Sequence, residues 1–186
     1  MKRAYLITEA QSDVEILKTL LPRSIVRSVK LVVVGDDSYS IISSTSTLLI
    51  ARRVSVAAVI NAHTLNAMKI RERVAFLRSM IHQASTDVRY EIFPAVPEIE
   101  SVFFQDRRFI EKLAKKTFTE MEWNFAKLNP KEALTYLLGN SAPLNSKILH
   151  RLTDETVRVL QQHSLIARLS EFLSSVLESN KFAKAA

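Results

Sequence analysis

Acidic side chains follow the first of several short apolar segments, and two of them are spaced to face one site. Glu9 ends the apolar run at residues 4–8, and Asp13 follows four residues later. If the chain after Glu9 is helical, residues four apart lie on the same face of that helix. Carboxylate oxygens are the hard ligands that Mg²⁺ takes in proteins. The spacing therefore predicts a site at this point that is capable of holding a metal ion.

Further polar side chains follow the third and fourth apolar segments. Asn61 and His63 come directly after the third, and Glu98 and Glu100 come soon after the fourth. In an open parallel sheet, ligands bind at the carboxyl ends of the strands, so these groups are expected to gather at one edge. His63 is a candidate metal ligand and, when protonated, a phosphate ligand; an ordinary polar loop histidine is the alternative. The alternative for the acidic residues is that they are helix caps and loop residues.

The apolar segments that would position these groups alternate with stretches of helical periodicity. The second and third segments are continuous and rich in Val, which is typical of parallel strands covered on both faces. The fourth places Arg89 and Glu91 between apolar neighbours, which favours the edge of a sheet. This order predicts an α/β fold with a four-stranded, mainly parallel, Rossmann-like sheet and right-handed crossovers. The strands are expected at residues 4–8, 29–34, 54–60 and 88–93.

The helices between these strands are marked by caps and by apolar stripes. The first is expected to begin after a capping Ser12 and to stop before Pro22. The clearest covers residues 66–81, where Asn66 is expected to form the cap and apolar residues recur on one face. Its basic residues are expected to form a solvated surface. They are Lys69, Arg71, Arg73 and Arg78.

The chain changes character after Pro97 and is mostly helical in pattern from there on. We therefore predict an α/β domain over residues 1–104 and a helical extension over residues 105–186. The extension is expected to pack on the α/β domain or on a partner, and a second copy of the chain is one such partner. Its long apolar stripes favour a packing role over chemistry.

The composition narrows the classes of function. The chain has 186 residues and no cysteine, which excludes a disulfide scaffold, a thiolate zinc site and a cysteine nucleophile. Its two glycines, Gly35 and Gly139, are too far apart for a Walker-A phosphate loop. No stretch approaches the roughly 20 apolar residues of a membrane span, and the first residues are not typical of a signal peptide. We expect a cytoplasmic protein without a membrane partner, and the net charge of +7 favours nucleic acid as a partner.

The order of these residues resembles the TOPRIM domain. Residues 4–13, where an apolar run ends in Glu9 and Ser12-Asp13 opens a helix, are similar to the glutamate motif of that family. The spacing of Glu9 and Asp13 resembles that of the overcoming-lysogenization-defect nucleases within the superfamily. Residues 97–100, Pro-Glu-Ile-Glu, resemble a later acidic element of stand-alone TOPRIM-like proteins and of those nucleases. The likeness covers approximately residues 3–104.

The resemblance implies phosphodiester chemistry on nucleic acid, with Mg²⁺ or Mn²⁺ as the cofactor. It implies Glu9 and Asp13 as catalytic residues and metal ligands, with Glu98 and Glu100 as further ligands. Asn61 and His63 stand where the family has its pair of aspartates. This replacement removes two negative charges and two hard oxygen ligands from a site that is meant to hold a divalent cation.

Three hypotheses of function follow. The first is a TOPRIM-like protein with a degenerate metal site that binds nucleic acid weakly and without sequence preference, or binds a protein partner, in a DNA-repair or phage-defence system. The second is an active nuclease, dependent on a divalent metal, with a rearranged site built from Glu9, Asp13, His63, Glu98 and Glu100. The third is a domain that binds a small molecule, although no glycine-rich phosphate loop follows the first apolar segment.

Overall fold

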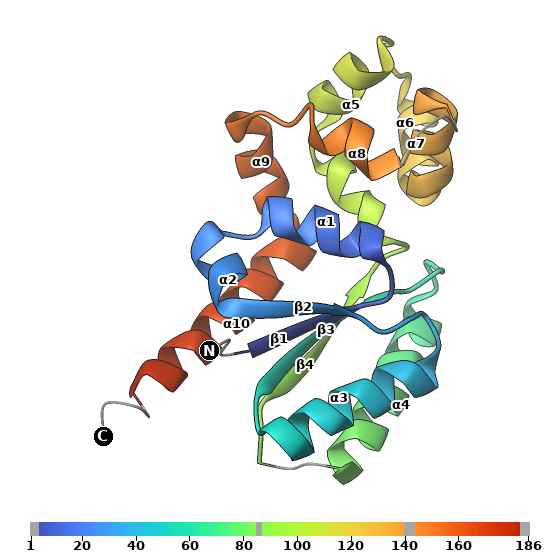
Figure 1. The fold of residues 1–186 in the computed structure, drawn as a ribbon. Helices are drawn as coiled ribbons and strands as arrows, with labels where there is room; N and C mark the ends of the chain where they lie inside the picture. The colour runs from blue at the N-terminus through green and yellow to red at the C-terminus, as the bar shows by residue number, and fades with distance from the viewer. Residues whose placement is uncertain (1–3, 85–86, 140–143, 183–186) are drawn as a thin grey trace.

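A four-stranded parallel sheet forms the centre of the computed structural model, which describes residues 4–84, 87–139 and 144–182. The strands are β1 (Ala4–Thr8), β2 (Val29–Val33), β3 (Ser55–Asn61) and β4 (Tyr90–Ala95), in the order β2-β1-β3-β4 (Figure 1). The predicted α/β class and four-stranded parallel sheet are confirmed. The alternating pattern of the fourth segment also predicted its place correctly, since β4 lies at an edge.

Helices cover both faces of the sheet, because successive side chains of a strand point to opposite faces. Tyr5 and Ile7 of β1 pack toward α3 (Ser38–Arg52) and α4 (Ala67–Ala84). Leu6 packs toward α1 (Gln11–Leu20), α2 (Arg23–Ser28) and α10 (Ser164–Phe182). Figure 1 shows these two helical layers on either side of the strands. Burial on both faces explains why the strands are continuous apolar runs.

The helix caps differ in part from those predicted. Asn66 precedes α4 as expected, and its Oδ1 accepts hydrogen bonds from the backbone N–H groups of Met68 at 3.0 Å and Lys69 at 3.2 Å. Ser12, by contrast, lies inside α1, and Ala10 takes the N-cap position. The Asp13 carboxylate reaches back to accept a hydrogen bond from the Ala10 backbone N–H at 3.2 Å. Asp13 is therefore held at the start of α1 by the backbone that follows β1.

The chain after β4 is helical, as predicted. A 3₁₀ helix, η1 (Ile99–Gln105), leads into a group of four short helices beyond the carboxyl ends of the strands (Figure 1). Trp123 lies at the centre of this group, with its ring centroid 5.3 Å from that of Phe104 and 5.9 Å from that of Phe118. These aromatic rings are core residues. The helices are α5 (Arg107–Ala114), α6 (Glu120–Leu128), α7 (Pro130–Leu138) and α8 (Leu144–Leu149).

The chain returns to the sheet through α10 (Ser164–Phe182). After α9 (Asp154–Gln161), α10 packs on the same face of the sheet as α2. It buries Leu169 and Leu173 in the core on that face. The residues predicted as a helical extension thus complete the core of the α/β unit. None of the helices in the described ranges is both long enough and apolar enough to cross a membrane.

Candidate functional site

Glu9 lies at the carboxyl end of β1 with both carboxylate oxygens engaged. Its Oε2 accepts a hydrogen bond from the Asn61 backbone N–H at 2.7 Å. Its Oε1 lies 3.1 Å from Nη2 of Arg73, which forms an ion pair with it. The Glu9 side chain is only 2% exposed. A buried carboxylate is tolerated in a fold when partners such as these compensate the loss of water.

Asp13 lies beside Glu9, one helical turn further along the chain. In addition to the Ala10 N–H, Asp13 accepts hydrogen bonds from Ser12 Oγ at 3.2 Å and, at a long 3.4 Å, from Asn61 Nδ2. The residue is 2% exposed. Glu9 and Asp13 thus both contact Asn61, but not as neighbours on one helix, because Glu9 precedes the N-cap of α1.

Asn61 connects the elements of the site, because each of its polar groups has a partner. Its Oδ1 accepts the Ile99 backbone N–H at 2.8 Å, which fixes the start of η1 against the end of β3. Its backbone carbonyl accepts a hydrogen bond from Arg73 Nη1 at 2.6 Å. An aspartate at this position would lack the amide donor that faces Asp13, and it would add a third negative charge. The neutral amide therefore fits this position because it can both donate and accept.

Arg73 joins the ends of three strands. Its guanidinium contacts Glu9 after β1, the Asn61 carbonyl at the end of β3, and the Asp36 carbonyl after β2, the last at 3.3 Å. The prediction that Arg73 belongs to a solvated surface is wrong. Side chains of a helix point back toward its N-terminus, so a long side chain about two turns into α4 reaches the strand that precedes that helix. This geometry lets basic side chains of α4 reach the strand ends, but the sequence does not distinguish Arg73 from its basic neighbours.

His63 and Glu98 form a second pair, nearer to the solvent. His63 Nδ1 lies 3.5 Å from Glu98 Oε1, and their side chains are 54% and 23% exposed. The backbone of His63 has φ +51°, in the left-handed region that a non-glycine residue occupies at a cost of about 1 kcal/mol. The His63 N–H donates to the Pro97 carbonyl at 2.8 Å, which helps to hold this conformation. Strained positions of this kind cluster at functional sites.

Burial raises the pKa of three carboxyl groups in this region: Glu9, Asp13 and Glu100. For Glu9, the hydrogen bond from Asn61 and the charge of Arg73 act in the opposite direction without cancelling the effect of burial. For Glu100, the charges of Glu98 and Asp13 raise the pKa further, whereas Lys131 lowers it. Burial therefore disfavours the ionised form of these carboxyl groups, as is common where a site serves a function.

The five predicted metal ligands are divided between two places. Glu9 and Asp13 meet at Asn61, and His63 pairs with Glu98, while Glu100 is buried between them on η1. Within residues 4–84, 87–139 and 144–182, no three His, Asp or Glu side chains form a group that could hold a metal ion. A magnesium ion requires several free oxygen ligands. The arrangement does not fit that ion, because Arg73 and Asn61 already contact the Glu9 oxygens.

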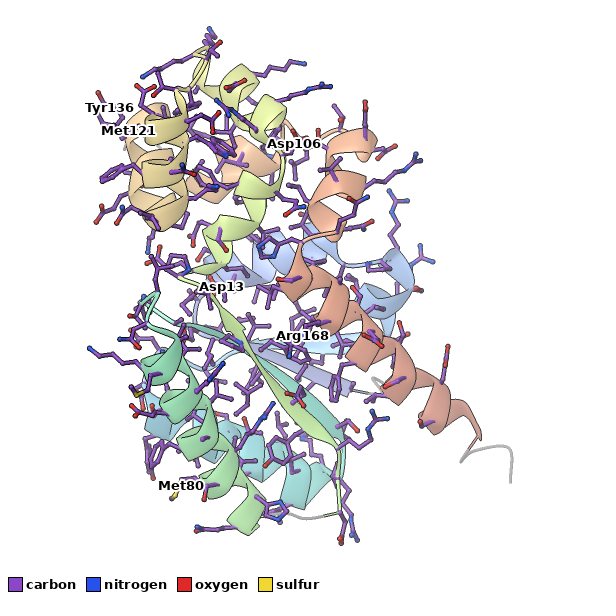
Figure 2. The ribbon with its side chains drawn as sticks, turned by 180° about the vertical axis from the view of Figure 1, so that it is seen from behind. Asp13, Met80, Asp106, Met121, Tyr136 and Arg168 are labelled. Atoms are coloured by element: carbon purple, nitrogen blue, oxygen red, sulfur yellow. The ribbon has the colours of Figure 1, made fainter. Side chains whose placement is uncertain are left out.

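A cavity of about 970 Å³ opens beside the His63–Glu98 pair. Its opposite wall comes from the end of α6 and from α7, and it includes Lys131 and Tyr136. Figure 2 shows Asp13 where the sheet meets the upper group of helices, with Tyr136 on the outer side of that group. Lys131 could not be identified from the sequence, because only the return of α7 to η1 brings it near the carboxylates.

The site is thus a group of buried carboxylates held by one asparagine and one arginine, beside an open cavity. The chemistry available to it is hydrogen bonding and charge pairing within the protein, together with a more exposed His–Glu pair that faces the cavity. Comparison with models of protein families, with curated proteins and with solved structures finds no match for this chain.

Proposed function

We propose that this chain is a TOPRIM-like protein that binds nucleic acid and does not cleave it. The observation that carries the proposal is the ion pair of Arg73 with Glu9, next to the neutral Asn61. The TOPRIM family is expected to hold a divalent cation against this glutamate. In this chain, a fixed guanidinium supplies the positive charge at the same carboxylate.

Charge balance supports the non-catalytic part of the proposal. A divalent cation that entered beside Glu9 would meet the charge of Arg73 at close range, where like charges repel strongly in a buried site. It would also have to displace the hydrogen bond between the Asn61 N–H and Glu9 Oε2. Metal-assisted phosphodiester cleavage needs an ion that positions the attacking and leaving oxygens. The described arrangement offers no open pair of carboxylates for that role.

The overall charge supports the binding part of the proposal. The chain carries 26 Lys and Arg residues against 19 Asp and Glu residues. Several cations form internal ion pairs, but other basic side chains stay exposed, among them Arg108 and Lys112 on α5. Contacts between such side chains and phosphates give binding that does not depend on base sequence. Membership of a DNA-repair or phage-defence system stays a prediction.

The test combines a binding assay with a cleavage assay on the purified full chain. Short labelled DNA and RNA, single-stranded and duplex, are titrated between about 50 and 200 mM salt, where phosphate-dominated affinity falls steeply. The same substrates are incubated with Mg²⁺ or Mn²⁺ and analysed for products. We expect salt-sensitive binding and no cleavage. Absence of binding at low salt would overturn the binding function, and cleavage that Glu9→Ala abolishes would overturn the non-catalytic assignment.

One observation favours the second candidate, a nuclease with a rearranged site. The strained His63 and its partner Glu98 face the cavity beside α7, where a substrate has room to approach. If this pair acted in catalysis, cleavage would be lost in both His63→Gln and Glu98→Gln. Thr64→Ala is the control, because Thr64 lines the same cavity, and cleavage should persist in that variant. The cleavage assay therefore separates the two candidates.

A further inference from the structure

A second cavity, of about 610 Å³, lies between α5 and the chain that leads into α9. It is separate from the carboxylate site, and three of its lining side chains are basic. Arg108 and Lys112 come from α5, and Arg151 comes from the segment before α9. Residues 108 and 112 are four apart, so their side chains are neighbours on one face of the helix. The three cations thus converge from two elements that are more than 30 residues apart in sequence.

The three cations are not neutralised by ion pairs within the described parts of the chain. There, Arg108, Lys112 and Arg151 have no carboxylate within ion-pair distance. The adjacent Arg107 is the opposite case, because its guanidinium binds Glu111, Glu120 and the Phe118 carbonyl. Glu111 and Glu120 therefore pair with Arg107 and not with the cations of the cavity.

Two carboxylates also line the cavity, and the balance of charge stays positive. The Asp106 side chain accepts a hydrogen bond from the Phe109 backbone N–H at 3.0 Å and so caps α5. Figure 2 shows Asp106 at the start of α5. Glu155, in the first turn of α9, is the other. Three cations therefore face two carboxylates, and one of the two is engaged by a backbone donor.

The rest of the cavity wall is apolar and in part hydroxylic. Phe109 and Leu113 are buried beneath the cations, and Thr153 and Thr156 lie on the α9 side. A low-dielectric floor under charges of one sign strengthens the attraction of a counter-ion. A phosphate group that enters the cavity would therefore meet Arg108, Lys112 and Arg151 above an apolar floor.

We propose that this basic cavity, defined by Arg108, Lys112 and Arg151, binds the phosphodiester backbone of nucleic acid. This inference rests on the proposed function and assigns its binding surface. The cations recognise phosphate oxygens and not base edges, so the contact is independent of sequence. The carboxylate site and the α4 surface are not required for this contact.

The test compares two double variants that each remove one Lys and one Arg. R108Q/K112Q removes the cations of the cavity, and K69Q/R71Q removes two exposed cations of α4. Each is assayed as the full chain with the DNA and RNA used above, across the same range of salt. Thermal unfolding verifies that both variants are folded. Log affinity falls as log salt rises, and each phosphate contact adds about 0.9 to the steepness of that fall. The loss of two contacts in R108Q/K112Q should therefore make the fall less steep by about 2.

The same relation predicts that R108Q/K112Q binds roughly 50-fold more weakly at about 0.1 M salt. The single variant R151Q should weaken binding by roughly 10-fold, and K69Q/R71Q should bind as the unmodified chain does. If the unmodified chain binds but R108Q/K112Q binds equally well, the cavity assignment is overturned and the proposed function stands. If the unmodified chain binds no nucleic acid, the proposed function itself fails. Displacement of the labelled DNA by inorganic phosphate at micromolar concentration would instead assign the cavity to a small phosphorylated ligand.

Discussion

Arg73 places Nη2 3.1 Å from Oε1 of Glu9, across 64 residues of sequence. The Glu9 side chain is 2% exposed, so the guanidinium is the charge that compensates a carboxylate removed from water. Removal of one partner of a buried pair costs more than the pair contributes, because the other charge is left uncompensated. The stability of the site therefore depends on Arg73 directly.

Substitution of Arg73 by Ala should lower the free energy of unfolding by about 3 kcal/mol. The loss comes from the uncompensated Glu9 and from the Asn61 and Asp36 carbonyls, which lose a donor. Urea-induced unfolding measures the effect. Arg71→Ala on the same helix is the control, because Arg71 is exposed. In a Glu9→Gln background the effect of Arg73→Ala should shrink, and an undiminished effect would show that the ion pair is not its cause.

The paired change Asn61→Asp and His63→Asp should create a response to magnesium. The carboxylate introduced at position 61 would add a negative charge beside Glu9 and Asp13 and remove the amide donor, so the variant should be destabilised without metal. Mg²⁺ should then raise its melting temperature by about 5–10 °C at saturation. Differential scanning calorimetry with and without Mg²⁺ measures this difference. The unmodified chain serves as the control and should not respond; an equal shift in both proteins would contradict the role given to Asn61 and His63.

The raised pKa of Glu100 should make the protein less stable as pH rises. The folded state holds the Glu100 proton more tightly than the unfolded state, so ionisation favours unfolding. Stability should fall from about pH 4, the pKa of an unfolded glutamate, up to the raised pKa of the folded state. Glu100→Gln should therefore be more stable than the unmodified chain at pH 7, with a difference that narrows toward pH 4. Chemical denaturation across pH measures this; Glu132→Gln, at an exposed position, should leave the profile unchanged.

Leu173 of α10 is fully buried against the sheet, and Leu173→Ala should cost about 3 kcal/mol of stability. The cause is the loss of apolar contact together with the cavity left behind. The exposed Leu128 provides the control, and Leu128→Ala should change stability by about 0.5 kcal/mol or less. Both changes are measured by urea unfolding. A small effect at Leu173 would mean that α10 is not part of the core.

The strands could be predicted from the sequence because each is a local apolar run. The four predicted segments differ from β1 to β4 by two residues at most. The contact of Glu9 and Asp13 with one asparagine could be predicted only in part. The ends of parallel strands meet at one edge of the sheet, but the helical spacing of four does not apply, because Glu9 precedes α1. The basic residue that pairs with Glu9 could not be predicted, because Arg73 is one of several basic residues on an amphipathic helix. Only the packing of α4 against α3 and β4, which brings Arg73 to the end of β1, distinguishes it from Arg71, two residues earlier.

The same contrast holds in the second half of the chain. The helices follow from their apolar stripes, but the return of α10 to the sheet depends on contacts between residues such as Leu6 and Leu173. A pattern at one position contains no information about a partner more than 160 residues away. The basic cavity could not be seen from the sequence for this reason, since Arg151 joins Arg108 and Lys112 only when α9 packs beside α5 and η1.

The position of α10 has a consequence for how the protein is made. The fourth strand of the sheet ends at Ala95, but α10, which covers part of one face, begins only at Ser164, 69 residues later. At about 5–20 residues per second, a ribosome needs roughly 3–14 seconds to synthesise that interval. During this time, the part of the apolar face that α10 will cover lacks that helix. The nascent chain is therefore exposed to aggregation, or available to a chaperone, until α10 emerges.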